Sequence, residues 1–388
     1  MIDLTNNTLF PPIDEKILTG KTMTSPTLAN KPLRVVIDTD LDNEVDDFFA
    51  LAHLALAHHD KTIHIEAIYA APYSFRSRLL EMLQALDLQK LKNPSPQEQA
   101  VIDSYAGQIA SIKAQGDNPQ DWLYPPSGGP EGSYDHVAIG PKVGMERSFS
   151  AINTLLPALK IKPPVFKGAS EYMTNGCPVR SEAIDHLIKL AMKASPEDPI
   201  YVMGLACATN LASALLIEPR IRENVIMTWT AGYPSNVTTS ENTSFNLSQD
   251  VDAAQVLFSC GVPLVYLPGF YIGQQLTLSE PDMQCWFKDS GCIGQLLFDR
   301  YNNNPLFKWY GINPDNLAGR IWNIWDLVNG AWLVNPGAVK TQQVRTPLLN
   351  DDKFWVTNPM GQLMVEGSYT SYNLVMPDFV RRLQQFAK

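Results

Sequence analysis

The sequence predicts a single α/β domain with a mostly parallel central sheet flanked by helices, arranged as a Rossmann-like open sheet. Two observations predict this class. Short β-branched and apolar runs alternate with apolar helical stretches along most of the chain, and such alternation is typical of parallel strands covered on both faces by helices. The 388 residues are 45% hydrophobic and 18% charged, which are ordinary values for a globular enzyme with a large core.

The predicted elements begin with a strand at residues 33–38, which is rich in β-branched side chains and ends at an acidic residue. An apolar helical stretch at 48–56 follows after a short loop, and the pattern then returns to a strand at 64–69. Further predicted elements are a helix at 181–191, a strand at 200–204, a helix at 210–216, a strand at 225–229, a helix at 251–260 and a strand at 262–267.

Two stretches interrupt this alternation. Residues from about 79 to 141 contain mixed polar helix followed by a run rich in Pro and Gly, and we interpret them as an insertion over the sheet. A second helical excursion is predicted at 281–316. Residues 1–32 contain no continuous apolar run of the kind a signal peptide or membrane helix requires, and they read as a polar N-terminal arm. Residues 33–388 then form the predicted domain.

The excess of acidic over basic residues limits which partners the chain can bind. The formal net charge of −10 opposes attraction to nucleic-acid polymers and to anionic membranes, because both are negatively charged. A small neutral ligand or a bound cation fits this charge better. The five cysteines form no zinc-type cluster, and their odd number argues against a complete disulfide framework. We therefore expect reduced thiols in a cytoplasmic protein.

The most informative segment is the acidic loop between the first strand and the first helix. It reads IDTDLDNEVDD and places six acidic residues within ten positions. In open α/β sheets ligands bind beyond the carboxyl ends of the strands, which is where this loop is expected. Carboxylates crowded this closely repel one another unless a cation or shared protons neutralise them, and a divalent ion with Ca²⁺ favoured is the natural partner. The acids that bracket the turn are Asp38, Asp40, Asp46 and Asp47.

Three other interpretations apply to the acidic loop. Asp42 or Glu44 can stabilise the helix N-terminus as simple caps, but capping does not explain four further acids. An EF-hand is excluded because the sixth place is Asn43 where Gly is required and the twelfth is Phe49 where Glu is required. A phosphatase that uses Asp38 as an aspartyl nucleophile stays as the enzymatic alternative.

Later stretches of the sequence extend the pattern of the acidic loop. DTD at 38–40 is followed by DD at 46–47 and an apolar helix. The later stretches, in order, are VFKGA at 165–169, GLACATNLASAL at 204–215, SFNLSQDVDAA at 244–254 and WDLV at 325–328. From about residue 33 to residue 336 the chain thus resembles the inosine/uridine-preferring nucleoside hydrolase family, as a divergent member. The resemblance implies a nucleoside hydrolase-like domain that cleaves ribosyl N-glycosidic bonds.

The resemblance also implies a calcium site and a catalytic base. The implied ligands of the ion are the carboxylates of Asp40, Asp47 and Asp326 and the backbone carbonyl of Thr209. The ion would also bind the ribose 2′- and 3′-hydroxyls and a water, while Asp46 accepts a proton from that water as it attacks the anomeric carbon. Asp38 would lie beside the ion as a second acid in contact with the substrate region.

The substrate residues follow the family pattern only in part. The resemblance implies that Asn246 binds the ribose, that Asn236 is a partner of the 5′-hydroxyl, and that Glu241 substitutes for a glutamate expected at Ser244. Trp325 stands where members with purine activity often place a histidine that protonates the departing base. Trp325 would either stack on the base or pack in the core. The leaving group would then be protonated by another residue or activated only by stacking and solvent, or the substrate is not a usual nucleoside.

Basic residues near the predicted insertion suggest a divergent branch of the family. Arg76 and Arg78 could approach the site through the insertion, and among the histidines His136, which lies in the insertion, is a candidate substitute acid. The alternative for the arginines is that they are solvated or paired with acids, which is the commoner fate of exposed cations.

Two functional hypotheses follow from these residues. The first is an enzyme that hydrolyses the N-glycosidic bond of a ribonucleoside or related ribosyl compound in a calcium-dependent reaction, releasing base and ribose. The second is a calcium-dependent ribosyl-binding protein that has lost efficient leaving-group activation at Trp325. The resemblance also implies a homo-oligomer, either a dimer or a tetramer. Release of reducing sugar distinguishes the two hypotheses.

Overall fold

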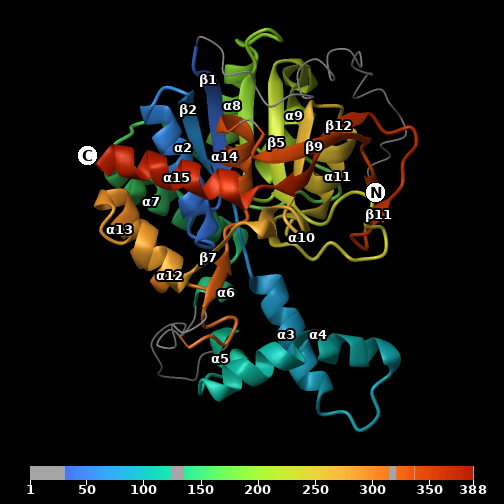
Figure 1. The fold of residues 1–388 in the computed structure, drawn as a ribbon. Coiled ribbons are helices and arrows are strands. Elements are labelled where there is room, and N and C mark those ends of the chain that lie inside the picture. Colours follow the sequence, from blue (N-terminus) through green and yellow to red (C-terminus); the bar gives the residue numbers. More distant parts are fainter. Residues whose placement is uncertain (1–30, 124–134, 314–319, 336, 388) are drawn as a thin grey trace.

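The computed structural model describes residues 31–123, 135–313, 320–335 and 337–387, and Figure 1 shows their arrangement. The polar arm predicted at residues 1–32 lies outside the described residues except for its last two. Among the described residues an eight-stranded sheet forms the centre, in the order β3-β2-β1-β4-β5-β6-β12-β9. Its strands are β1 (Leu33–Thr39), β2 (Ile63–Ala70), β3 (Val165–Lys167), β4 (Ile200–Gly204), β5 (Val225–Ala231), β6 (Leu264–Pro268), β9 (Val339–Arg345) and β12 (Leu363–Thr370).

The sheet is mostly parallel, as the sequence predicts. Every neighbouring pair from β3 to β12 is parallel, and only β9 runs antiparallel to its neighbour β12. All six strands and helices expected between 181 and 267 are present within a few residues of their expected bounds. The predicted α/β class with a single central sheet is therefore confirmed.

Helices cover both faces of this sheet because successive side chains of a central strand point to opposite faces. Val35 and Ile37 of β1 pack into one hydrophobic cluster, whereas Val36 packs into the other. Helices that contribute to the first cluster include α2 (Asp46–His59), α7 (Pro141–Leu159), α13 (Gly291–Asn302), α14 (Leu327–Val334) and α15 (Tyr372–Ala387). The helices of the second are α8 (Glu182–Ala191), α9 (Thr209–Ile217) and α11 (Val251–Ser259).

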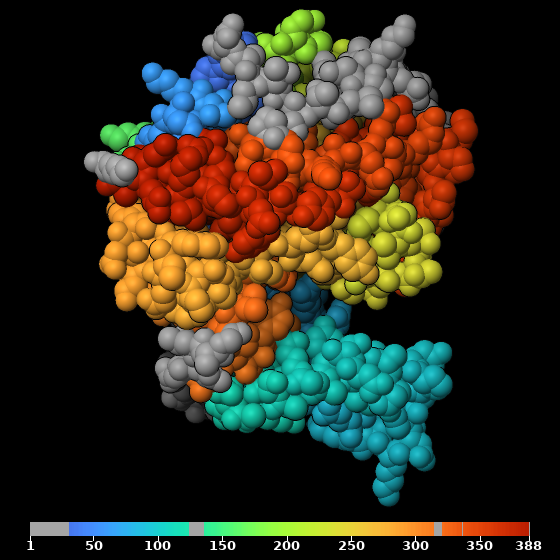
Figure 2. All heavy atoms as spheres, in the orientation of Figure 1, coloured from blue at the N-terminus to red at the C-terminus, as the bar shows by residue number. Residues whose placement is uncertain are grey.

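A helical layer occupies the stretch in which the sequence predicts an insertion. Its elements are α3 (Arg76–Leu88), α4 (Pro96–Ala114), α5 (Pro119–Leu123) and α6 (Asp135–Ala138). In Figures 1 and 2, α3 and α4 project from one end of the molecule, away from the sheet. Ser95 begins α4 with a capping box, in which its hydroxyl accepts a hydrogen bond from the backbone of Glu98 and the Glu98 carboxylate accepts one from the backbone of Ser95.

The remaining elements are short and lie mainly near the carboxyl ends of the strands. The strands are β7 (Thr277–Ser279), paired antiparallel with β8 (Ile321–Asn323), and β10 (Leu348–Leu349), paired with β11 (Trp355–Val356). The helical turns are η1 (Pro219–Glu223), α10 (Phe245–Ser248), η2 (Gly273–Gln275), α12 (Glu280–Asp282) and η3 (Met283–Phe287). Within the described residues, no helix has both the length and the apolar character needed to cross a membrane.

Candidate active site

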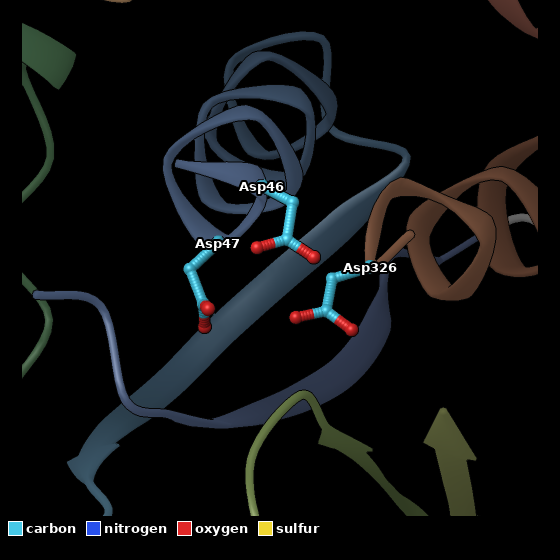
Figure 3. A group of neighbouring side chains, drawn as sticks. All are labelled: Asp46, Asp47 and Asp326. Atoms are coloured by element: carbon cyan, nitrogen blue, oxygen red, sulfur yellow. The ribbon is translucent and has the colours of Figure 1, made fainter. Parts of the chain in front are cut away.

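Three carboxylates from distant parts of the chain meet beyond the end of β1. Asp46 and Asp47 are the first two residues of α2, and Asp326 immediately precedes α14. One oxygen of each lies within 4.8 Å of the others, and Figure 3 shows the three side chains pointing toward one another. The three acids are buried. We call Asp46, Asp47 and Asp326 the carboxylate cluster.

The fold brings these acids together through two helix N-termini. β1 leads through a short loop into α2, and α14 packs beside α2. The positive end of each helix dipole therefore faces the same small volume, which stabilises negative charge there. The sequence expectation that Asp326 meets the acidic loop is consistent with this placement.

Asp40 extends the cluster along the loop. The negative charges of Asp47 and Asp46 act on its carboxyl group, so Asp40 lies close to the cluster. Asn43 donates from Nδ2 to Asp40 Oδ2 at 3.2 Å, and Thr39 donates its hydroxyl to Asp47 Oδ1. Asp40 Oδ1 is buried and has no hydrogen-bond partner among the described residues. An oxygen that is buried without a partner is costly, so it is well placed to bind a cation.

The pKa values of these acids reflect the same crowding of carboxylates. Burial raises the pKa of Asp47 to about 7. Burial, followed by the charges of neighbouring carboxylates, raises the pKa values of Asp40, Asp46 and Asp326 well above the usual range. A hard divalent cation would remove both causes, because it replaces water and neutralises the repulsion. The donor set, made of carboxylate oxygens, suits Ca²⁺.

Asp38 lies at the end of β1 and is held by Asn210. Asn210 donates from Nδ2 to Asp38 Oδ1 at 2.7 Å and accepts from the backbone of Ala169 at 2.8 Å. The other oxygen of Asp38 has no partner among the described residues. Burial raises the pKa of Asp38 to about 7, although the bond from Asn210 opposes the shift. Asp38 is fully buried and does not line the cavity described below.

Thr209 is the first residue of α9, beside the acidic loop. β4 pairs with β1, so the start of α9 lies next to the end of β1. The hydroxyl of Thr209 donates to Asp250 Oδ2 at 2.5 Å. Asp250 also accepts from the backbone of Met173 at 2.9 Å and caps α11 through Ala253. Asp250, which the sequence analysis does not assign, therefore fixes the turn that carries the Thr209 carbonyl.

A cavity of about 260 Å³ opens beside the carboxylate cluster. It is formed where the sheet, the loops after β5 and β6, and the helical layer meet. Its lining residues are Asn43, Glu44, Asp46, Asp47, Arg78, Thr230, Ala231, Thr243, Ser244, Phe245, Asn246, Gly269, Phe270, Tyr310, Trp325 and Asp326. Acidic side chains thus share the cavity with four aromatic residues and one arginine.

Two of the expected substrate residues line this cavity. Asn246 donates both amide hydrogens to backbone carbonyls, at 2.7 Å to Leu205 and at 3.0 Å to Thr230. Its Oδ1 is therefore the atom left to accept a hydrogen bond from a ligand. Trp325 is half-buried at the cavity wall, next to Asp326. A core position for Trp325 does not fit this exposure.

The three other expected substrate residues lie outside this cavity, namely Asp38, described above, Asn236 and Glu241. Asn236 is exposed, and Glu241 is exposed and forms an ion pair with Lys353 at 2.6 Å. Neither lines the cavity. His136 is also absent from the lining, since it is buried and its Nε2 lies 3.0 Å from the carbonyl of Asn43.

Several lining residues are not identified as site residues by the sequence analysis. Glu44, interpreted there as a possible helix cap, makes no capping bond and accepts a hydrogen bond from Trp322 Nε1 at 2.7 Å. Burial, followed by the charge of Asp46, raises the pKa of Glu44 well above its usual range. Tyr310 and Phe270 join from loops outside the recognised stretches. Of Glu44, Tyr310 and Phe270, only Glu44 lies in a segment that the sequence singles out, which is the acidic loop.

Comparisons with known proteins agree with this geometry. A family model described as inosine-uridine preferring nucleoside hydrolase matches residues 35–366. A pyrimidine-specific ribonucleoside hydrolase, RihB, of Escherichia coli O1:K1 is 30% identical over 188 residues, which cover 47% of this chain and 54% of that protein. The chain therefore spans about half the length of this curated relative.

Solved structures show a similar fold at low sequence identity. A plant nucleoside hydrolase has a TM-score of 0.57 and 13% identity, with 91% of this chain and 99% of that chain covered. A purine-preferring ribonucleoside hydrolase from Gardnerella vaginalis has a TM-score of 0.54 and 17% identity, with 92% and 99% covered. These similarities establish the fold.

Proposed function

Because this chain belongs to the inosine-uridine preferring nucleoside hydrolase family, we propose that it hydrolyses the N-glycosidic bond of a ribonucleoside or a related ribosyl compound in a calcium-dependent reaction. The observation that carries this proposal is the meeting of Asp326 with Asp46 and Asp47 at the wall of a cavity. A cavity of about 260 Å³ lined by both acidic and aromatic side chains suits a sugar joined to a planar base.

The proposed ion ligands are the carboxylates of Asp40, Asp47 and Asp326 and the carbonyl of Thr209. Burial and the partnerless oxygen of Asp40 support this set. When bound, calcium would supply the positive charge that lowers the pKa of a nearby water and orients the ribose hydroxyls. Asp38, held by Asn210 behind the loop, adds negative charge to the same region.

The chain's own residues then perform the proton transfer and the sugar contacts. Asp46 lies at the cavity wall and would accept a proton from the attacking water. Asn246, held by two backbone carbonyls, would accept a hydrogen bond from the ribose through Oδ1. The carboxylates would also stabilise the positive charge that develops on the sugar as the glycosidic bond breaks.

The identity of the base is a separate question. The relatives differ in their stated preference, since one is described as pyrimidine-specific and another as purine-preferring. Trp325 lines the cavity and would stack on the base. We also propose that the protein acts in the cytoplasm on a small-molecule substrate and assembles as a dimer or tetramer, as the resemblance implies.

A binding function is the second candidate, because no histidine lines the cavity among the described residues. A protein that holds calcium and a ribosyl ligand without activating the leaving group would show saturable binding without sugar release. A phosphatase is less well supported, because Asp38 would be its nucleophile and is fully buried away from the cavity.

The test is a panel of ribonucleosides assayed for release of reducing sugar, with calcium and with a calcium chelator. We expect release that depends on calcium and falls by about 10²- to 10⁴-fold in Asp46→Asn, because the general base is lost. The matched control is Asp185→Asn, an exposed acid on α8 that pairs with Arg180. Calcium-dependent ligand binding without sugar release would support the binding function, and chelator-insensitive hydrolysis would contradict the proposed metal site.

A further inference from the structure

Arg78 is the one arginine among the residues that line the cavity described here. It lies in the first turn of α3 and is half-buried. Its Nη2 donates to the carbonyl of Thr243 at 2.5 Å and lies 3.4 Å from Ser248 Oγ. Its guanidinium carbon lies 5.0 Å from the centre of the Phe245 ring. These contacts hold the guanidinium group in one place beside the Phe245 ring.

The positive charge of Arg78 is not neutralised by an ion pair. Among the described residues, no carboxylate oxygen forms a salt bridge with it within 4.0 Å, although its charge is felt by Glu44 and by Tyr310. Nη2 makes both of its hydrogen bonds, so the donors on Nε and Nη1 are left over. A permanently charged guanidinium with remaining donors at a cavity wall is suited to an oxygen that carries negative charge.

The reaction creates such an oxygen. When the bond between the anomeric carbon and the base nitrogen breaks, its electron pair stays on the base, and a base with a ring carbonyl, such as uracil or hypoxanthine, spreads that charge onto its carbonyl oxygen. Trp325 cannot donate a proton to the base in the way a histidine can. Some other group must lower the energy of the departing anion, and a fixed cation does so without transferring a proton.

We propose that Arg78 binds the leaving base and stabilises the negative charge that develops on its carbonyl oxygen. This inference rests on the proposed function and names its substrate class, which is ribonucleosides whose base carries a carbonyl oxygen. The anomeric carbon gains a bond to the water oxygen, Asp46 takes one water proton, and the base departs with the electron pair of the broken bond. The base anion then takes a proton from solvent, and Asp46 returns its proton to solvent.

The experiment compares leaving groups that differ in how much stabilisation their departing anions require. The substrates are uridine, inosine and p-nitrophenyl β-D-ribofuranoside, whose nitrophenolate is stable as a free anion. Arg78→Gln removes the charge but keeps a donor for Thr243 or Ser248. We expect kcat/KM for uridine and inosine to fall by about 10²-fold, while the nitrophenyl riboside changes by less than about threefold. Arg78→Lys should recover part of the loss because it restores the charge.

The matched control is Arg76→Gln. Arg76 is exposed in the same turn of α3, donates to the carbonyl of Ala138 at 3.1 Å and does not line the cavity, so all three substrates should be unaffected. Circular dichroism and thermal unfolding check that each variant folds. If Arg78→Gln does not fold, the Lys variant carries the test, with a smaller but equally selective loss expected because its point charge lacks the planar donors.

Three results would overturn the inference. An equal fall for all three substrates would mean that Arg78 positions the sugar or the structure. No fall for any substrate would mean that its charge does not act on the base. Uridine 5′-monophosphate is therefore assayed as a fourth substrate, and a fall seen only with this compound would mean that Arg78 binds a phosphate. By contrast, a wild-type protein that hydrolyses none of the ribosides, including the nitrophenyl compound, would refute the proposed function itself and this inference with it.

Discussion

The side chain of Asn246 is held in one orientation by two backbone carbonyl groups. Both amide hydrogens are donated to the carbonyls of Leu205 and Thr230, which belong to the loop after β4 and to β5. The amide orientation is therefore determined by two neighbouring strands of the sheet. Since a rigid acceptor loses little entropy on binding, this arrangement favours recognition of a ribose hydroxyl.

We predict that Asn246→Asp weakens both folding and substrate binding. A carboxylate has no hydrogen to donate, so it would face the carbonyl oxygens of Leu205 and Thr230 and leave them unpaired. The expected loss in the free energy of unfolding is about 1–3 kcal/mol, with a raised KM. Urea unfolding and steady-state kinetics measure the two effects. Unchanged values for both would show that these bonds contribute nothing.

The sequence predicts some of these residues better than others. Asp46, Asp47 and Asp326 stand in short patterns that can be read from the chain, and the structure brings them together. Tyr310 and Phe270 have no such pattern, because they reach the cavity only through the packing of separate loops. Asn236 and Glu241 were placed by spacing along one loop, and spacing does not determine which way a loop folds.

At the scale of elements, the turn after β3 shows why a small residue is required. A Cβ added at Gly168 would lie 2.2 Å from the carbonyl oxygen of Ala70 and 2.5 Å from Asn210 Nδ2. Asn210 is the residue that holds Asp38. A side chain at position 168 would therefore push β2 and α9 apart and disturb the acidic loop.

We predict that Gly168→Ala lowers the free energy of unfolding by about 1–3 kcal/mol, because backbone and a buried amide must shift to admit the methyl group. The activity should fall as well, since Asn210 loses its contact with Asp38. The control is Gly107→Ala in α4, where nothing lies within 4 Å and alanine favours the helix. Equal stability of the two variants would contradict this account.

The contact between α2 and α15 predicts that the stability of the protein falls at acidic pH. Asp378 in α15 accepts a hydrogen bond from Arg382 Nε at 2.8 Å and lies 3.7 Å from His53 Nε2. Burial alone would raise the pKa of Asp378, but these partners outweigh it and hold the pKa far below the usual range. A lowered native pKa gives stability that is present above the unfolded value of about 4 and is lost as the pH falls below it.

We expect Asp378→Asn to destabilise the protein by about 3 kcal/mol near neutral pH, because Arg382 is left buried with only its bond to Asp60. As the pH falls from 5 to 3, the free energy of unfolding should also decrease less in the variant than in the wild type, because the variant lacks the Asp378 carboxylate whose protonation weakens the wild type. Thermal unfolding over this pH range measures both effects. An acid dependence identical to that of the wild type would contradict the assignment to Asp378.

The order of strands and helices was predictable only where the chain has strong apolar periodicity. The strands β1, β2, β4, β5 and β6 are nearly fully buried and are read directly from the sequence. β9 (Val339–Arg345) reads VKTQQVR and is mostly exposed, so its sequence contains no apolar run. Its pairing with β12 is long-range, and tertiary pairing rather than local pattern decides it.

At the scale of the whole molecule, the carboxylate cluster predicts that calcium and pH act together on stability. Without calcium, Asp38 and Asp47 have pKa values of about 7, above the value of about 3.9 for aspartate in an unfolded chain. A raised native pKa gives stability that is fully present below the unfolded value and is lost as the pH rises through the native one. The metal-free protein should therefore be less stable at pH 8 than at pH 6.

We expect calcium to reverse this trend, since the ion binds the ionised carboxylates. At a free concentration 100 times the dissociation constant, calcium should add about 2.7 kcal/mol, or about 3 °C in the unfolding midpoint, with a larger shift at pH 8 than at pH 6. Scanning calorimetry with calcium or chelator measures this, and Asp326→Asn is the variant that should abolish the shift. A calcium shift of the same size in that variant would place the ion elsewhere.

The meeting of Asp326 with Asp46 and Asp47 also orders events during translation. The two aspartates of α2 leave the ribosome well before Asp326 and the strand β12 that follows it. A nascent polypeptide that stops before Asp326 lacks one carboxylate of the proposed ion site and a strand of the sheet, so we expect it not to retain calcium. Ion binding at this site would then have to wait until these distant segments have been made and have docked.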